Sequence, residues 1–200
     1  MVENHIAKGA DISIATIPVG EREAPEFGIL KANDDNLITS FIEKPAKELL
    51  DQWESDTGDE MQSQGRKYLA SMGIYIFNRK MLFDELLIDK KDATDFGKEI
   101  IPDSISNKKV VSFQYDGYWT DIGNIYSFYE ANLALTLEIP PFNLFDNNRA
   151  IFSRARMLPP MKIGNTQVEH SILAEGSIID ASRIVSSVIG IRTRIRKGTE

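Results

Sequence analysis

The sequence predicts an α/β fold in which a mixed sheet with helices is followed by the start of a parallel β-helix. The sheet is indicated by short runs rich in β-branched residues that alternate with helical segments to about residue 137, and residues 68–77 form the most apolar run. The β-helix is indicated by a six-residue spacing of isoleucines, with one shift of a single residue, at Ile172, Ile178, Ile184, Ile189 and Ile195.

Two prolines separate these parts of the chain. Pro140 and Pro141 end a helix and begin an irregular segment that runs to about residue 160. We therefore expect residues 1–145 to form the sheet-containing domain, residues 146–162 a linker and residues 163–200 the first turns of the β-helix. Because three hexads make about one turn, the last segment holds only about two turns.

The first elements are predicted from local patterns. Residues 1–8 form a helix, and Gly9 stands where helices commonly end. Residues 11–19 form a strand rich in isoleucine. Residues 27–32 and 37–43 form two further strands, joined by a turn of Asn and Asp residues.

The middle of the chain alternates between irregular and regular segments. Residues 47–64 are acidic, lack sustained periodicity and are expected to form a surface loop or lid with at most one short helix. Residues 68–77 are predicted to be a central strand, and residues 80–88 a short helix. Residues 95–102 are expected to be a loop that enters a helix, which Pro102 stops or kinks.

A glycine-bounded turn follows the last predicted strand, at residues 110–115. Asn124 then caps a helix that carries apolar residues as far as Leu137. Asp121 lies in this turn beside two aromatic residues, where a carboxylate can hold a hard cation such as Mg²⁺. A turn-forming or capping role for Asp121 is the alternative.

The composition excludes several classes of protein. The net charge is −7, and the residues from Arg149 onward carry nine Lys or Arg against four Asp or Glu, so residues 1–148 carry −12. A body this acidic argues against nucleic-acid binding. Cysteine is absent, which excludes disulfides and thiolate metal sites. Since neither a membrane-spanning run nor a secretory signal is present, we expect a soluble cytoplasmic protein.

The strongest candidate for a binding site is the end of the strand at residues 37–43. Pro45 disfavours helix at Lys44 and is expected to hold it extended, so that Glu43 and Lys44 point to opposite faces. A lysine at the end of an α/β strand suits a phosphate, and a carboxylate accepts hydrogen bonds from sugar hydroxyls. The alternative is a charged pair at an exposed strand end.

Small residues on two strands leave room beside this position. Gly28 interrupts one strand, which indicates either a β-bulge or the close approach of another group. Ser71 and Gly73 interrupt the apolar strand at residues 68–77, which leaves space either for a ligand or for packing.

Six motifs follow one another in unbroken order along nearly the whole chain. They are Glu-Phe-Gly-Ile at 26–29, Phe-Ile-Glu-Lys-Pro at 41–45, Ala-Ser-Met-Gly-Ile-Tyr-Ile-Phe at 70–77, Asp-Phe-Gly-Lys-Glu-Ile-Ile-Pro at 95–102, Tyr-Trp-Thr-Asp-Ile-Gly at 118–123 and Pro-Pro at 140–141. In this order they resemble the glucose-1-phosphate adenylyltransferase family, also called ADP-glucose pyrophosphorylase, of bacterial glycogen synthesis.

The resemblance implies a partial nucleotidyltransferase domain with a Rossmann-like mixed sheet, then a left-handed parallel β-helix. It implies transfer of the adenylyl group of ATP to glucose 1-phosphate with release of pyrophosphate. In the family, residues matching Gly28, Glu43, Lys44 and Ser71 contact glucose 1-phosphate, and the aspartate matching Asp121 helps to hold catalytic Mg²⁺. The family is usually a tetramer, so a homo-oligomer is expected.

The sequence also departs from the family pattern. No Gly-rich nucleotide loop followed by a basic residue is present, and neither is the family's first metal-binding aspartate. We therefore expect a fragment that carries the sugar-phosphate half and does not catalyse alone. The family binds allosteric effectors between its domains, and the basic residues Arg192, Arg194, Arg196 and Lys197 could serve that role or form a solvated face.

Three alternatives remain open. One is a sister nucleotidyltransferase that uses another sugar 1-phosphate, because the residues that choose the base are absent. Another is a non-catalytic regulatory subunit, although Glu43, Lys44, Ser71 and Asp121 are all retained. The last is a β-helix acyltransferase, for which His170 would be the candidate catalytic histidine.

Overall fold

The computed structural model describes residues 1–84, 88 and 91–199. The chain divides into two compact units, Met1–Asp116 and Gly117–Glu200, which are described separately below. This division falls earlier along the chain than the predicted boundary at residue 145, because the helix that follows Asn124 groups with the β-helix. The predicted domain boundaries themselves stay a prediction.

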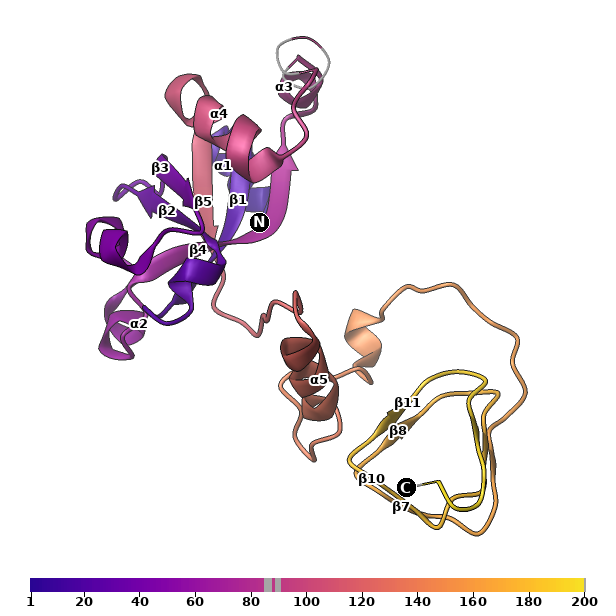
Figure 1. Cartoon of the computed structure of the whole chain (residues 1–200). Coiled ribbons are helices and arrows are strands. Elements are labelled where there is room, and N and C mark those ends of the chain that lie inside the picture. The colour runs from indigo at the N-terminus through magenta and orange to yellow at the C-terminus, as the bar shows by residue number, and fades with distance from the viewer. Residues whose placement is uncertain (85–87, 89–90, 200) are drawn as a thin grey trace. The chain divides into compact units, whose positions relative to one another are not determined.

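The first unit is built on one five-stranded sheet (Figure 1). Its strand order is β3-β2-β4-β1-β5, and only the β1–β5 pair is parallel. The mixed α/β fold predicted from the sequence is therefore confirmed, with residues 68–77 in the middle of the sheet. The strands are β1 (Ile12–Val19), β2 (Gly28–Ala32), β3 (Ile38–Glu43), β4 (Tyr68–Phe77) and β5 (Val110–Gln114).

Helices cover both faces of this sheet. On one face, Met81, Ile101 and Ile105 pack against apolar side chains of β1, β2, β3 and β5. On the other face, buried His5 of α1 is hydrogen-bonded through Nδ1 to the Oγ of Ser13, 2.8 Å away. The described α-helices of this unit are α1 (Val2–Lys8), α2 (Asp59–Ser63), α3 (Arg79–Asp84) and α4 (Ile101–Asn107). The 3₁₀-helices are η1 (Ala24–Glu26) and η2 (Lys47–Trp53), and η4 (Phe96–Ile100) is a π-helical turn.

Two helix predictions are confirmed in their described parts. Gly9 ends α1 in the left-handed conformation, with φ of 53°, which a residue without a Cβ adopts at little cost. α3 begins within a residue of the predicted start at 80, and residues 85–87 of that predicted helix lie outside the described residues.

The prediction that Pro102 could stop a helix is wrong. Pro102 lies in the first turn of α4, where a missing N–H leaves no intrahelical hydrogen bond unmade. The chain passes from the π-helical turn η4 directly into α4, so the proline begins a helix and does not stop one.

The acidic segment at residues 47–64 is more ordered than predicted. It contains the two short helices η2 and α2, and Leu50 on η2 is fully buried. Ser55 donates from Oγ to the carbonyl oxygen of Leu30 on β2 at 3.2 Å, and Thr57 donates to that of Arg66 at 2.6 Å. These contacts anchor the segment to the sheet.

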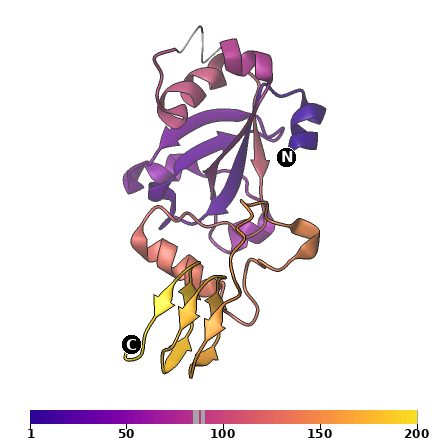
Figure 2. The same cartoon turned by 90° about the vertical axis from the view of Figure 1, so that its right-hand side faces the viewer.

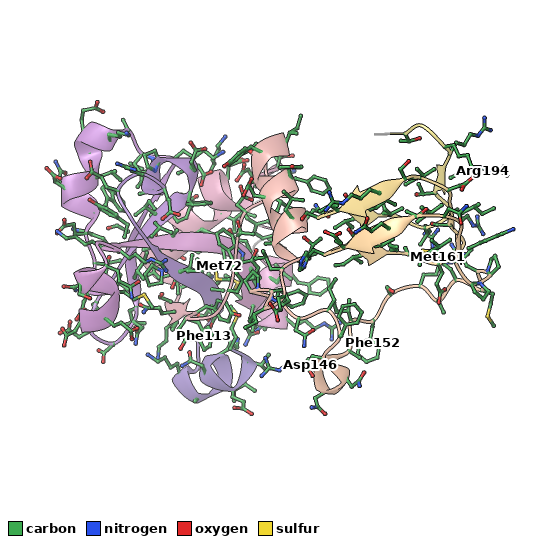
Figure 3. The ribbon with its side chains drawn as sticks, turned by 90° about the horizontal axis from the view of Figure 1, so that it is seen from below. Met72, Phe113, Asp146, Phe152, Met161 and Arg194 are labelled. Carbon is green, nitrogen blue, oxygen red and sulfur yellow. The ribbon has the colours of Figure 1, made fainter. Side chains whose placement is uncertain are left out.

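The second unit contains α5 (Ile125–Ala134), which has the predicted cap. The Asn124 side chain accepts from the backbone N–H of Ser127 at 2.8 Å, and the Ser127 hydroxyl interacts in return with the Asn124 N–H. An irregular segment with one short turn, η5 (Asn147–Arg149), follows; Figure 3 marks Asp146 and Phe152 on it.

Short parallel strands then wind into a three-sided coil, which is visible end-on in Figure 1 and from the side in Figure 2. Ile178 pairs with Lys162 and with Arg194, each sixteen residues away, so one turn is slightly shorter than three hexads. The strands are β6 (Lys162–Ile163), β7 (Gln167–Glu169), β8 (Ile172–Leu173), β9 (Ile178–Ile179), β10 (Arg183–Val185), β11 (Val188–Ile189) and β12 (Arg194–Ile195).

The core of the coil corrects two members of the predicted isoleucine series. In β8, Leu173 packs against the core and pairs with Ile189, so Leu173 and not Ile172 is the inward residue. Ile179 is fully buried, together with Ala181 and Ile184, whereas the neighbouring Ile178 is 41% exposed. Side chains alternate along a strand, so the inward position in β9 is one residue later than the hexad spacing predicted. On the surface, the Arg183 guanidinium donates to Glu169 at 2.9 Å and holds the pKa of that carboxyl below its usual range.

Among the described residues, no helix is both long and apolar enough to cross a membrane.

Candidate functional site

Gly28 and Glu43 face each other at the end of the β2–β3 hairpin. A Cβ added to Gly28 would lie 2.5 Å from Cζ of Phe41 and 2.8 Å from Oε2 of Glu43. The predicted close approach is therefore made by the chain's own side chains. The bulge considered for Gly28 is wrong, because the register of this hairpin shifts between Lys31 and Ala32 instead.

Ser71 extends this pair into a row across three strands. β2 pairs with β4 through Ile29 and Ala70, so one further step along the antiparallel register brings Ser71 beside Gly28. Paired residues of neighbouring strands project on the same face of a sheet. Glu43, Gly28 and Ser71 therefore follow one another across β3, β2 and β4, although the first and last are 28 positions apart in the sequence.

A bulge in β4, in which three residues lie opposite one, fixes the surroundings of Ser71. Residues 72–74 lie opposite the single residue Ala15, and Met72 at the start of the bulge is marked in Figure 3. Gly73 has a φ of 70°, a conformation that favours glycine, and its N–H donates to Oγ of Ser71 at 3.3 Å. The two small residues thus form one local structure, which the sequence did not predict.

Lys44 departs from its predicted conformation. Its φ is 47°, in the left-handed region, so the prediction of an extended lysine is wrong. The N–H of Lys44 donates to the carbonyl oxygen of Phe27 at 3.0 Å, which continues the hairpin one residue beyond β3 and turns the chain there. The side chain is exposed, and no ion pair joins it to any other described residue.

A third segment, the start of η4, also lies beside the Glu43 carboxylate. A Cβ added to Gly97 would lie 3.3 Å from Oε2 of Glu43 and 3.4 Å from Oδ1 of Asp95. No role was predicted for Asp95 or Gly97 from the sequence. A capping aspartate followed two residues later by glycine was the available signal, but only the fold brings that glycine to β3.

Asp121 belongs to the second unit, whereas the row on the sheet belongs to the first. Its carboxylate is exposed and folds back over its own turn, so that a Cβ added to Gly123 would meet Oδ2 at 2.7 Å. Among the described residues, no group of three or more His, Cys, Asp or Glu side chains could hold a metal. A single carboxylate such as that of Asp121 is chemically suited to be one ligand of a hard cation, and its metal-binding role stays a prediction.

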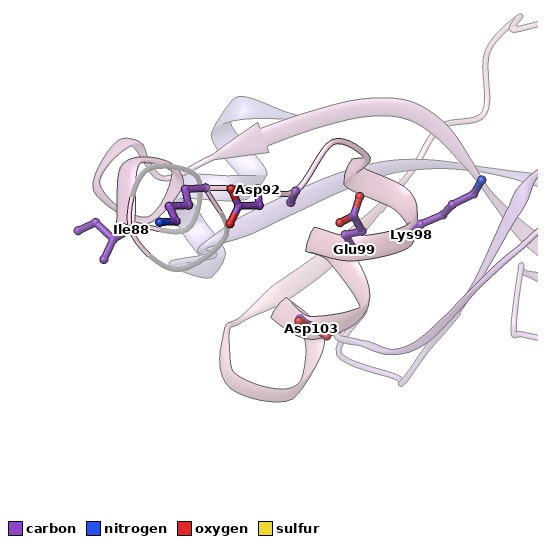
Figure 4. Close-up of a pocket in the computed structure, with 7 residues that line it drawn as sticks. Ile88, Asp92, Lys98, Glu99 and Asp103 are labelled. Carbon is purple, nitrogen blue, oxygen red and sulfur yellow. The ribbon is translucent and has the colours of Figure 1, made fainter.

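A separate depression of about 380 Å³ lies beside η4 (Figure 4). It is lined by charges of both signs and by none of the predicted site residues, and in Figure 4 the Lys98 side chain extends away from Asp92 and Ile88. Its lining residues are Ile88, Lys91, Asp92, Ala93, Lys98, Glu99 and Asp103.

Comparison with known families agrees with both parts of the fold. Residues 1–138 match the family described as nucleotidyl transferase. The chain belongs to the nucleotidyl transferase family. Residues 156–200 match the GLGC left-handed parallel β-helix domain, which also gives the hand of the coil. The two matches in this order identify a sugar-1-phosphate nucleotidyltransferase of the ADP-glucose pyrophosphorylase-like type.

Proposed function

We propose that this nucleotidyl transferase chain binds glucose 1-phosphate at the end of the β2–β3 hairpin, for adenylyl transfer from ATP in glycogen synthesis. The observation that carries the proposal is the row of Glu43, Gly28 and Ser71, which ends next to Lys44, whose exposed side chain forms no ion pair with the described residues. A carboxylate and a hydroxyl are suited to sugar hydroxyls, and a flexible ammonium is suited to a phosphate.

The proposed reaction needs no covalent intermediate with the protein. An oxygen of the sugar phosphate bonds to the α-phosphorus of ATP while the bond from that phosphorus to the β-phosphate oxygen breaks, and pyrophosphate leaves. The residues of this chain bind and orient the sugar phosphate. Asp121 supplies a ligand to Mg²⁺, which when bound neutralises charge on the phosphates.

Isothermal titration calorimetry with glucose 1-phosphate tests the proposal. We expect Lys44→Ala to weaken binding at least about tenfold, since a hydrogen bond to a charged group contributes about 1.5–3 kcal/mol and 1.4 kcal/mol is a factor of ten. Lys80→Ala, which removes an exposed lysine outside the row, is the matched control and should bind normally. Repeating the titration with Mg²⁺ and ATP on Asp121→Asn tests the metal ligand.

Two competing ligands define the outcome. Glucose 6-phosphate should not bind, because its phosphate is attached at carbon 6 of the sugar and not at carbon 1. Equal or tighter binding of mannose 1-phosphate would support a sister nucleotidyltransferase instead. Unchanged affinity of Lys44→Ala would contradict the role proposed for Lys44.

A further inference from the structure

Two glycines from distant parts of the chain flank one oxygen of Glu43. A Cβ on Gly28 would lie 2.8 Å from Oε2 of Glu43, and a Cβ on Gly97 would lie 3.3 Å from the same atom. The first glycine belongs to β2 and the second to η4. The carboxylate therefore fits a slot that exists only because both residues lack a side chain.

The η4 side of this slot is held by carboxylates at the start of the helical turn. Asp95 accepts from the N–H of Lys98 at 3.0 Å. Oε1 of Glu99 accepts from the N–H of Thr94 at 3.1 Å, from its hydroxyl at 3.2 Å and from the N–H of Asp95 at 3.1 Å. Hydrogen bonds thus fix the backbone both before and after Gly97.

Aromatic rings hold the same segment against β4. The Phe96 ring stacks on Tyr75, with centroids 5.9 Å apart and an interplanar angle of 22°, and meets Phe77 at 5.4 Å. Tyr75 and Phe77 also pack against the main core of the first unit. Because Phe96 immediately precedes Gly97, these ring contacts restrain the backbone at Gly97 from moving away from Glu43.

We propose that Gly97 is a positioning residue that sets the orientation of the Glu43 carboxylate. The proposal rests on the proposed function, in which Glu43 accepts hydrogen bonds from the sugar. A methyl group at Gly97 displaces Oε2 by a few tenths of an ångström, because its Cβ would lie 3.3 Å from that oxygen, which is tighter than ordinary contact. Charge-assisted hydrogen bonds are sensitive to a displacement of that size.

Gly97→Ala separates this role from a structural one. Alanine is favoured over glycine within helical turns, so the melting temperature should stay the same or rise. We expect the affinity for glucose 1-phosphate, measured by calorimetry, to fall about tenfold. Gly20→Ala is the matched control in the same unit, because a Cβ there meets its neighbours at 3.7–3.8 Å, which is ordinary contact.

Combination with Glu43→Gln shows whether Gly97 acts through Glu43. If it does, Gly97→Ala should change the affinity of the Glu43→Gln chain by less than about twofold. Additive effects of the two substitutions, or a normal affinity of Gly97→Ala, would overturn the proposal.

A measurement on the chain without sugar separates the positioning role of Gly97 from the proposed binding of glucose 1-phosphate. The carboxyl ¹³C resonance of Glu43, assigned by its loss in Glu43→Gln, should shift in Gly97→Ala and stay in place in Gly20→Ala. An unaltered chain that binds no glucose 1-phosphate contradicts the proposed function alone, whereas an unmoved Glu43 resonance in Gly97→Ala refutes the positioning role.

Discussion

Lys44 adopts a backbone conformation that is unfavourable for lysine. A left-handed residue with a Cβ is destabilised by about 1–2 kcal/mol relative to the right-handed form, and a following proline restricts the backbone further. Lys44 has a φ of 47° and precedes Pro45, which is buried. Strain of this kind is concentrated at functional sites, where the side chain has a use that offsets it.

The strain at Lys44 leads to a prediction about stability and binding. Lys44→Gly keeps the N–H that bonds to Phe27 and removes the Cβ, so the free energy of unfolding should rise by up to about 1 kcal/mol. The same substitution removes the ammonium, so glucose 1-phosphate binding should weaken at least about tenfold, as for Lys44→Ala. Urea unfolding and calorimetry on one sample measure both effects.

The control is another left-handed residue outside the site. Asn36, with φ of 61°, lies in the turn before β3, and Asn36→Gly should leave binding unchanged. A Lys44→Gly chain that is less stable than the unaltered chain would show that the lysine side chain contributes to folding, contrary to our view.

The error at Lys44 has a clear physical origin. The rule for residues before proline is local, and it predicted an extended Lys44. The hydrogen bond from its N–H to Phe27 is set by hairpin register, which the sequence does not display. The residue types at Glu43 and Lys44 were readable from the sequence, but their backbone geometry was not.

Among the elements, the start of η4 is the one on which the site depends most. Glu99 accepts three hydrogen bonds that close this turn, from Thr94 and Asp95. We expect Glu99→Ala to lower the free energy of unfolding by about 1 kcal/mol, as for the loss of an exposed helix cap, and to weaken glucose 1-phosphate binding severalfold by loosening Gly97. Thermal unfolding and calorimetry measure the two effects.

Glu48→Ala provides the comparison for this substitution. Glu48 is exposed in the first turn of η2, and its removal should change neither stability nor binding. If Glu99→Ala binds glucose 1-phosphate as tightly as Glu48→Ala does, the cap at η4 does not support the site.

Most elements were predictable because their signals are local. The helix stop at Gly9, the turn before β3 and the cap at Asn124 depend on neighbours within a few residues. The row of Glu43, Gly28 and Ser71 depends on pairing of β2 with β4, which joins residues 41 positions apart. Pairing at that range follows from packing of the whole sheet, so the sequence identified these residues without predicting their order in space.

At the scale of the whole molecule, the two units have separate cores. The first is formed by side chains of the sheet and of α3 and α4, around Ile12 and Ile14. The second is the interior of the coil, around Ile179 and Ile184. Neither cluster includes residues of the other unit, so a cavity in one core should destabilise that unit first.

Adjacent isoleucines in β9 provide the test. Ile179→Ala should lower the free energy of unfolding of the second unit by about 2–4 kcal/mol because a fully buried side chain is removed. Ile178→Ala, at a side chain 41% exposed, should cost less than about 1 kcal/mol. Each unit holds one of the two tryptophans, Trp53 and Trp119, so Trp53→Phe leaves urea unfolding of the second unit visible by fluorescence. If Ile179→Ala and Ile178→Ala lower the free energy of unfolding by equal amounts, the coil is not packed around Ile179.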